Sequence, residues 1–477
     1  MPEEQPRRSR REPANRSGPD RAGTRALRYG TLTLLALGAA GAVALLAARE
    51  DPARPAAPPV PPPRAESAPR GAIAATFSVP DAGPGRWHEF RTHRFDSRLS
   101  PEQRAEIERL EALGYVGGSR ETDGPSRVTV HDPRRAYAGL NLATSGHGPE
   151  AFLLDMEGEV LHRWRHAFWD VWPEYPVARD APPTQVWRRV HLYGNGDLLA
   201  IFEGLGLIKL DADSNLIWAR PLRAHHDLEV MPDGRIYVLT REAHLVPRIN
   251  EEEPVVEDFV SILDASGQEL RRVSLLAALE RSDFAREWRE SGGRRGDLFH
   301  TNSLSVLDGS LERKTPGFRA GNILVSLLTL DMVAVVDLEQ EKIVWARRGS
   351  FRRQHDPKRI ANGNLLLFDN VGSRNASTVM ELDPRTGALV WQYSGDPASP
   401  FLSRTCGTAE RLPNGNTLIT ESDAGRAFEV TPEREIVWEF FNPHRAGERS
   451  QYIATLFEVV RLPADFDVSW ARGSRAE

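Results

Sequence analysis

Three histidines of this chain have positions that would let them act together, although they lie far apart in the sequence. His226, His300 and His355 each stand at the start of a short segment that we expect to form a β-strand. His226 and His355 each lie seven residues before the residue that precedes a turn glycine, Asp233 and Asn362 respectively. An imidazole can bind a metal ion, attack as a nucleophile or carry a proton. Matched positions in repeated units therefore predict one shared site.

A repeated pattern of strands would position these histidines. Each unit has a first strand, a turn with a glycine, an apolar second strand, and then two further strands joined by a turn. The pair Asn362-Gly363 is the clearest of these turns, because a type I′ turn needs positive φ at both central residues. Five complete units have their turn glycines at Gly196, Gly234, Gly321, Gly363 and Gly415. A unit of four short strands that recurs about every 40 to 50 residues is typical of the blades of a β-propeller.

A sixth blade can be assembled from the two ends of the repeating region. Residues 138–165 supply three strands, and residues 452–462 resemble a single first strand. Pairing these ends would close the ring and leave no exposed sheet edge. The predicted fold class is all-β, a six-bladed β-propeller in which N- and C-terminal strands close one blade. Tryptophans near the ends of fourth strands are expected to pack between blades: Trp164, Trp218, Trp345, Trp391 and Trp438.

Arginines are expected near the histidines. In a propeller the first strands line the central channel, and each hairpin places the start of the first strand level with the end of the second. Arg241 ends a second strand, and Arg374 lies in a comparable connection. Few carboxylates are among the channel-facing candidates, so the mouth favours an anionic group. Three functions stay open on this pattern: an enzyme acting on an anionic group, a non-catalytic propeller that binds an anionic ligand or protein partner, and a metal-dependent hydrolase or lyase.

Composition narrows the classes of function. The net charge of −6 argues against a nucleic-acid partner. Cys406 is the only cysteine, which excludes an intramolecular disulfide and a cysteine-based metal cluster. We expect Cys406 to be a small buried side chain.

The segment ahead of the repeats predicts attachment to a membrane. Eight arginines lie within residues 1–28, and the run 31–48 is apolar and uncharged. Such a run is close to the shortest length that spans a bilayer, and the arginines place the N-terminus in the cytoplasm. The propeller would then be membrane-anchored by a single pass, on the extracytoplasmic (periplasmic) side.

The whole chain is accordingly divided into six parts. The predicted parts are a cytoplasmic Arg-rich tail (1–28), a transmembrane anchor (29–49), a Pro-rich linker (50–95), a helix with a lead-in segment (96–135), the propeller (136–465) and a C-terminal tail (466–477). The helix begins with the capping box Ser100-Pro101-Glu102-Gln103 and ends at Gly114.

Several short motifs resemble the bacterial arylsulfotransferase family, in the same order along residues 135–465. They are Gly146-His147-Gly148-Pro149-Glu150-Ala151, His225-His226-Asp227-Leu228, His300-Thr301-Asn302-Ser303, and Gln354-His355-Asp356 with Asn362-Gly363-Asn364-Leu365-Leu366. The resemblance implies a six-bladed periplasmic propeller that moves a sulfuryl group from an aryl sulfate donor to a phenolic acceptor. In that family the route is ping-pong, a histidine is transiently sulfated, and no nucleotide sulfate donor is used.

The resemblance also implies roles for individual residues. His355 would be the nucleophile, His226 and His300 would hold sulfate oxygens or handle the phenolic proton, and Asn302 would contact the substrate. No cofactor or metal is expected. The family has an arginine at the end of the second strand where this chain has Leu328. Arg241 holds the equivalent place in the neighbouring blade, so we expect it to compensate, with Arg374 as a weaker candidate.

Overall fold

The computed structural model describes residues 100–103, 120–290, 295–372, 376–397, 399–447 and 449–473. All of them belong to the second of two compact units, Pro69–Glu477. The predicted tail, membrane anchor and linker lie outside the described residues, as does Arg374. Within the described ranges, no helix has the length and apolar character that a membrane crossing requires. The predicted capping box is confirmed at its start, because Gln103 N donates to Ser100 Oγ (3.1 Å) and Ser100 N donates to Gln103 Oε1 (2.9 Å).

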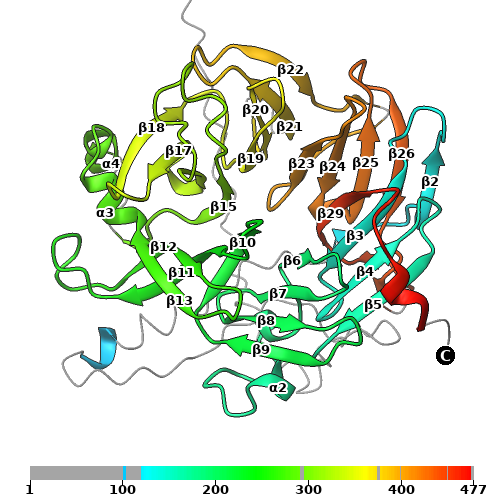
Figure 1. Cartoon of the computed structure of the whole chain (residues 1–477), viewed down its shortest axis with the longest axis horizontal. Coiled ribbons are helices and arrows are strands. Elements are labelled where there is room, and N and C mark those ends of the chain that lie inside the picture. Colours follow the sequence, from blue (N-terminus) through cyan, green and yellow to red (C-terminus); the bar gives the residue numbers. More distant parts are fainter. Residues whose placement is uncertain are drawn as a thin grey trace, which may run out of the picture. The chain divides into compact units, whose positions relative to one another are not determined.

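Six antiparallel sheets of four or more strands surround a common centre (Figure 1). Five of them follow one another in the chain. Their strands are β6–β9 (Arg189–Leu192, Leu198–Phe202, Gly206–Leu210, Leu216–Arg220), β10–β13 (Ala224–Val230, Ile236–His244, Val255–Leu263, Glu269–Ser274), β15–β18 (Thr301–Val306, Ile323–Leu327, Met332–Asp337, Lys342–Arg348), β19–β22 (His355–Arg359, Leu365–Asp369, Thr378–Leu382, Leu389–Tyr393) and β23–β26 (Thr408–Arg411, Thr417–Glu421, Arg426–Val430, Ile436–Phe441).

The sixth sheet joins the two ends of the propeller, as the sequence predicted. The C-terminal strand β29 (Leu456–Pro463) pairs with β3 (Gly139–Ser145), and β4 (Glu150–Leu154) and β5 (Val160–Arg165) complete the blade. The six-bladed propeller closed by its terminal strands is therefore confirmed. The lead-in segment adds a strand that the sequence did not indicate, since β2 (Arg127–His131) extends the sheet of β23–β26 beside β26.

The remaining elements are short. They are β1 (Arg120–Glu121), β14 (Gly296–Asp297), β27 (Arg445–Ala446), β28 (Tyr452–Ile453), the helices α2 (Phe168–Val171), α3 (Leu275–Glu280) and α4 (Ala285–Glu290), and the 3-10 turns η1 (Pro182–Thr184), η2 (Leu328–Leu330), η3 (Ser422–Ala424) and η4 (Ser469–Gly473). They lie in the connections between and around the blades.

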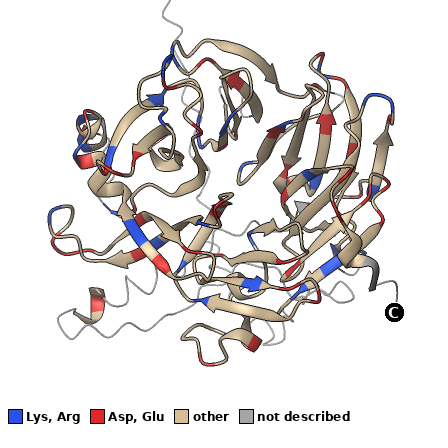
Figure 2. Cartoon of the chain, viewed as in Figure 1, with Lys and Arg blue, Asp and Glu red and all other residues tan. Residues whose placement is uncertain are grey.

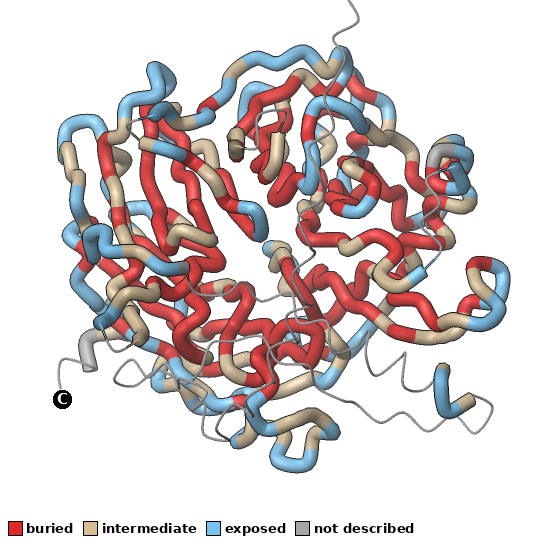
Figure 3. The backbone as a smooth tube through the Cα atoms, turned by 180° about the vertical axis from the view of Figure 1, so that it is seen from behind, coloured by how far each residue is buried: buried red, intermediate tan, exposed pale blue. Residues whose placement is uncertain are grey.

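Packing between blades involves the predicted tryptophans. Trp164 Nε1 donates to the carbonyl of Gly196 in the next blade (2.9 Å), and Trp438 Nε1 donates to that of Met156 (2.9 Å) across the closure. Figure 3 shows buried backbone toward the centre of the blades and exposed backbone on their periphery. Charged residues of both signs nevertheless occupy the inner strands as well as the outer loops (Figure 2). Buried charges near the centre need partners or a function, because burial of an unpaired charge is costly.

The inner strands are irregular where the predicted histidines lie. The pairing register shifts between Ala224 and Leu228 in β10, between Thr301 and Ser303 in β15, and between His355 and Lys358 in β19. His226 has a φ of 54° and His300 a φ of 48°, values that are uncommon for residues other than glycine. Bulges and unusual φ values redirect side chains and occur frequently at functional sites.

Candidate active site

The structure brings the three predicted histidines together at the same end of the inner strands. His226 lies in β10, His300 immediately precedes β15, and His355 begins β19. The rings of His226 and His300 meet edge to face, with centroids 5.1 Å apart. The charge of His300 is one of the influences that lower the pKa of both other histidines, after burial. Three blades thus contribute one imidazole each to a common site.

An amide fixes the protonation of His355. Its Nδ1 lies 2.7 Å from Asn370 Oδ1 and 3.1 Å from the carbonyl oxygen of Arg353. The Asn370 amide nitrogen donates to the carbonyls of Ser403 (2.9 Å) and Cys406 (2.6 Å), so its oxygen must face the imidazole. Both partners of Nδ1 are acceptors, which requires the proton on Nδ1 and leaves a lone pair on Nε2.

Burial keeps this imidazole neutral. It lowers the pKa of His355 to about 3, and the charges of Arg188 and His300 act in the same direction, whereas the hydrogen bond to Asn370 Oδ1 acts against them. A neutral imidazole with a free Nε2 lone pair is the form of histidine that attacks an electrophile.

The other two histidines have carboxylate partners instead. His300 Nδ1 lies 2.8 Å from Asp297 Oδ2, and its backbone N donates to Asp297 Oδ1 (2.9 Å). His226 Nδ1 lies 3.3 Å from Glu203 Oε1, and its backbone N donates to Glu203 Oε2 (2.9 Å). Burial lowers the pKa of His226 and raises the pKa of Glu203, so this pair can hold a proton on either partner. Such pairs suit proton transfer.

Further titratable groups extend from His226. His225 Nδ1 lies 2.9 Å from His226 Nδ1, and His225 Nε2 lies 3.6 Å from Asp258 Oδ1. Burial and then the charge of Asp297 raise the pKa of Asp258 to about 7. The carboxyl group of Asp258, next to His225, can therefore take up or release a proton near neutral pH.

The donor atoms of Glu203, His225 and His226 lie within 4.8 Å of one another, as a metal site would require. However, the charges of Arg241 and Arg188 both act on Glu203 and lower its pKa against the effect of burial. Two guanidinium groups beside the same carboxylate disfavour a third cation. This donor set fits an anionic ligand nearby better than a bound metal ion.

The predicted substrate-binding residues do not share one environment. Arg241, in β11, lies against Gly204, where a Cβ would be 2.1 Å from its Nη2, and its charge acts on Glu203. Asn302 is buried, and its Nδ2 donates to the carbonyl of Gln354 in the next blade (2.8 Å). Leu328 begins η2, directly after β16, and is buried. Arg374 lies outside the described residues.

The sequence reasoning missed four residues of this site: Arg188, Glu203, Asp297 and Asn370. A signal for Arg188 was present, because it lies eight residues before Gly196, as His226 and His355 lie eight before Gly234 and Gly363. Glu203 and Asn370 follow second strands, and Asp297 lies in an inserted segment. Those three become visible only when the fold places them beside an imidazole.

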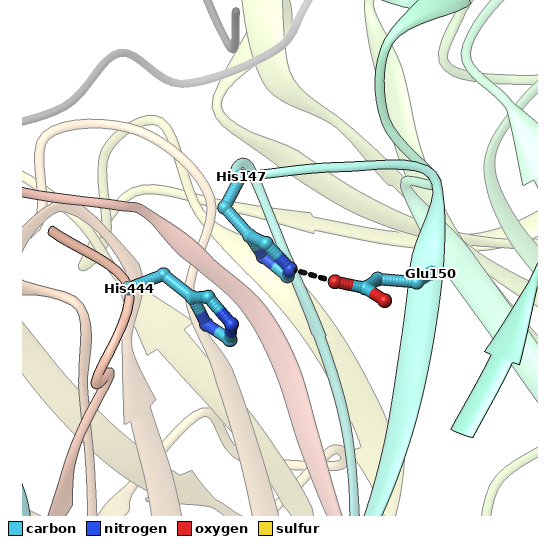
Figure 4. Close-up of side chains that lie close together, drawn as sticks. All are labelled: His147, Glu150 and His444. Atoms are coloured by element: carbon cyan, nitrogen blue, oxygen red, sulfur yellow. Dashed lines mark hydrogen bonds and ion pairs between the residues drawn. The ribbon is translucent and has the colours of Figure 1, made fainter. Parts of the chain in front are cut away.

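A second pair of histidines, the buried His147 and the half-buried His444, lies at the closing blade (Figure 4). His147 and His444 stack with centroids 3.5 Å apart and planes at 11°, and His147 Nε2 faces Glu150 Oε1. The lone pairs of an imidazole lie in its ring plane, so two parallel stacked rings do not direct them at one ion. Nδ1 of His147 also contacts Ser145 Oγ (2.5 Å). The arrangement is that of a packing contact between the β3–β4 turn and the segment after β26.

Comparisons with solved structures give matches of low identity and low TM-score. The chain is similar to a protein of unknown function from Bacteroides caccae (12% identity, TM-score 0.45, 68% of this chain and 98% of that chain). It is also similar to the β-propeller domain of Cps50 (Swd1) from Myceliophteria thermophila (12%, 0.40, 73% and 100%) and to streptogramin B lyase (12%, 0.40, 71% and 95%). These similarities are too low to bear on activity. No curated protein matches the chain.

A family model gives the identification. The model described as arylsulfotransferase (ASST) matches residues 189–443, which is more than half of the 477 residues. The matched range contains His226, His300 and His355 together with their partners Glu203, Asp297 and Asn370. This chain belongs to the arylsulfotransferase family.

Proposed function

We propose that the protein transfers a sulfuryl group from an aryl sulfate to a phenolic acceptor through a sulfohistidine at His355. The observation that carries this proposal is the difference between the partners of the three histidines. His355 alone of the three has an amide oxygen on Nδ1, while His226 and His300 have carboxylates. An amide oxygen fixes a neutral nucleophile, whereas a pair of an imidazole and a carboxylate can carry a transferable proton on one of its two partners.

In the first half-reaction, His355 Nε2 attacks the sulfur atom of the aryl sulfate. The N–S bond forms as the bond between sulfur and the aryl oxygen breaks. The leaving phenolate receives a proton from the His300–Asp297 or the His226–Glu203 pair. Asn370 accepts a hydrogen bond from Nδ1–H, which stabilises the positive charge that develops on the ring.

In the second half-reaction, the hydroxyl of the acceptor phenol loses its proton to the pair that was deprotonated in the first step. Its oxygen attacks sulfur, the N–S bond breaks, and the Nε2 lone pair is restored. The two half-reactions balance in protons and in sulfuryl groups without a nucleotide sulfate donor. The site must therefore hold one proton fewer in the sulfated intermediate than in the free enzyme.

The direct test uses the purified full chain with p-nitrophenyl sulfate. Without acceptor, we expect a burst of p-nitrophenol and a mass increase of about 80 Da on the peptide that contains His355, as expected for a sulfuryl group held in a covalent intermediate. Addition of a phenol should remove the adduct and give steady turnover, with or without a chelator. His355→Gln should abolish both signals. His166→Gln is the matched control, because His166 lies outside the site and its ring bonds to a backbone carbonyl, that of Ser214 (3.1 Å).

Two results would exclude this chemistry. Turnover that a chelator abolishes would favour a metal-dependent reaction at the same histidines. Binding of aryl sulfates without burst or adduct would favour a non-catalytic propeller.

We further propose that residues 29–49 anchor the protein in a membrane and that the propeller lies on the extracytoplasmic side. The support is the apolar run 31–48, the eight preceding arginines and the Pro-rich linker 50–95. The test is fractionation of cells, with alkaline extraction of membranes and protease treatment of spheroplasts. Retention in extracted membranes with the propeller cleaved from outside would agree. Recovery of the full chain in the soluble fraction would contradict the anchor.

A further inference from the structure

Arg188 is a buried cation whose hydrogen-bonding groups are largely unused. Only 2% of the residue is exposed, and it is among the largest fully buried side chains. Among the described residues, neither Nε nor Nη1 has a hydrogen-bond partner. Burial of guanidinium donors without acceptors is unfavourable, so such an arrangement usually reflects a ligand that supplies the acceptors.

We propose that Arg188 binds the sulfuryl oxygens of the substrate and takes the place of the arginine that Leu328 replaces. This proposal rests on the proposed function and assigns the residue that stabilises the transferred group. Arg188 makes and breaks no covalent bond in this role. Its N–H groups donate to oxygens that are equatorial while the aryl oxygen leaves and His355 Nε2 arrives.

The position of Arg188 in its blade supports this role. Arg188 immediately precedes β6, and its backbone N donates to the carbonyl of Ile201 (2.9 Å). Its distance of eight residues from the turn glycine equals that of His226 and His355 in their blades. The same structural position of three blades therefore supplies two imidazoles and one guanidinium to one end of the channel.

The surroundings of Arg188 point to the same centre. Its positive charge contributes to the lowered pKa of His226 and of His355, and it counteracts the raised pKa of Glu203, so it lies within electrostatic range of all three. Arg188 Cζ lies over the ring of Phe457, which is fully buried, at 5.3 Å from the ring centroid. An aromatic ring accepts none of the N–H hydrogen bonds that an acceptor oxygen would, so this contact leaves Nε and Nη1 able to bind oxygen atoms.

The other cationic candidates are engaged differently. Arg189, the next residue, contacts the carboxylates of Asp227 (3.1 Å) and Glu458. Arg241 lies against Gly204 beside Glu203. A planar fork of donors is well matched to two oxygens of a tetrahedral anion, and such donors are most effective where charge develops in the transition state.

The test compares Arg188→Met, which removes the charge, and Arg188→Lys, which keeps it but loses the fork, in the full chain. Arg235→Met is the matched control, because Arg235 is exposed and paired with Asp233. We expect Arg188→Met to slow the p-nitrophenol burst and the appearance of the His355 adduct by about 100- to 1000-fold, as for loss of one transition-state donor. The burst rate of Arg188→Lys should lie between those of Arg188→Met and the unmodified chain, with the main loss in kcat and a smaller change in KM. Arg235→Met should match the unmodified chain.

A merely structural role predicts a different pattern. Formation of the adduct in Arg188→Met or Arg188→Lys at the rate of the unmodified chain would overturn the proposal. A loss of activity that follows a loss of folded protein in both variants, measured by circular dichroism, would also overturn it.

Binding of inorganic sulfate, followed by calorimetry, separates this proposal from the proposed reaction. If the unmodified chain forms no adduct but binds sulfate, and Arg188→Met does not, the anion site is supported and the sulfotransferase reaction is not. If sulfate binds both chains equally, Arg188 is not the anion-binding residue.

Discussion

Two adjacent layers of the channel differ in how well their charges are satisfied, although they are built from neighbouring residues of the same strands. The transfer layer contains Arg188, His226 and His355. The charge layer contains the next residue in each case, namely Arg189, Asp227 and Asp356. In the transfer layer the guanidinium donors Nε and Nη1 have no partner among the described residues, and burial lowers the pKa of both imidazoles.

The charge layer is a closed network. Arg189 Nε lies 3.1 Å from Asp227 Oδ1, its Nη2 lies 3.9 Å from Asp356 Oδ1, and its Nη1 contacts Glu458. Both aspartates also accept a backbone N–H from the following blade. Asp227 Oδ2 accepts from Leu304 (3.0 Å), and Asp356 Oδ2 accepts from Ala409 (3.1 Å).

The comparison separates two uses of buried charge. Buried ionic groups that satisfy one another join blades, whereas groups left incompletely satisfied are available to a substrate. The bulge in β10 and the positive φ of His226 let consecutive residues enter the channel at different depths, since successive side chains of a regular strand would point to opposite faces.

The largest expected effect tests the two arginines against each other. Arg189→Met should lower the free energy of unfolding by about 3–5 kcal/mol, because it leaves buried carboxylates without their cation. Arg188→Met should not lower it, because among the described residues no carboxylate forms an ion pair with that guanidinium as Asp227 does with Arg189. Urea unfolding followed by tryptophan fluorescence measures both. Equal losses for the two variants would remove the distinction between the layers.

A second prediction concerns the support of the nucleophile. Asn370→Ala should lower the rate of the p-nitrophenol burst by about 10- to 100-fold, as is typical when a group that orients a reactive imidazole is removed. The proton is then no longer fixed on Nδ1, so part of the population presents N–H instead of a lone pair at Nε2. The check is single-turnover kinetics beside Asn364→Ala, since Asn364 lies in the turn before β20 and bonds to Glu381. A rate equal to that control would assign Asn370 to packing alone.

A smaller effect is expected when one carboxylate of the charge layer loses its charge. Asp356→Asn keeps an acceptor for the Ala409 N–H but weakens the ion pair with Lys358 Nζ (2.9 Å), which should cost about 1 kcal/mol of unfolding free energy. The His355 adduct should still form. Loss of the adduct in a stably folded Asp356→Asn chain would show that the charge layer takes part in the transfer.

The smallest expected effect is that the His355 imidazole does not titrate near neutral pH. The pKa of His355 is about 3 in the folded protein, below the ordinary value near 6.5. Its ring should therefore stay neutral from pH 8 down to about pH 5, while an unfolded chain would bind a proton below pH 6.5, so this residue makes folding less favourable as the pH falls. Nitrogen chemical shifts of labelled histidine measure the protonation directly. A midpoint near 6.5 for His355 would contradict a neutral nucleophile fixed by burial.

The fold could be predicted from local signals, whereas much of the site could not. Turn glycines such as Gly234 and Gly363 mark each hairpin, and the unmatched strand at residues 452–462 indicated closure of the ring, which β29 confirms. The histidines were found because matched positions in repeated blades must converge. That same rule identifies Arg188, which was overlooked because the strand was counted from Arg189.

Contacts between distant segments account for the rest. The Asn370 amide is oriented by carbonyls of Ser403 and Cys406 in the following connection, and Glu203 reaches His226 from the preceding blade. Neither contact has a spacing rule in the sequence. Both depend on the angle between blades, which results from packing of the whole ring.

The closure of the ring by β29 determines when the site can form during synthesis of the polypeptide. The strand that completes the ring also supplies Phe457 against the Arg188 guanidinium and Glu458 to Arg189. Emergence of the first five blades from the ribosome does not assemble the site, because these two partners are synthesised last. The surroundings of Arg188 and Arg189 are therefore complete only after β29 has been synthesised, and a polypeptide truncated before Phe457 would lack both contacts.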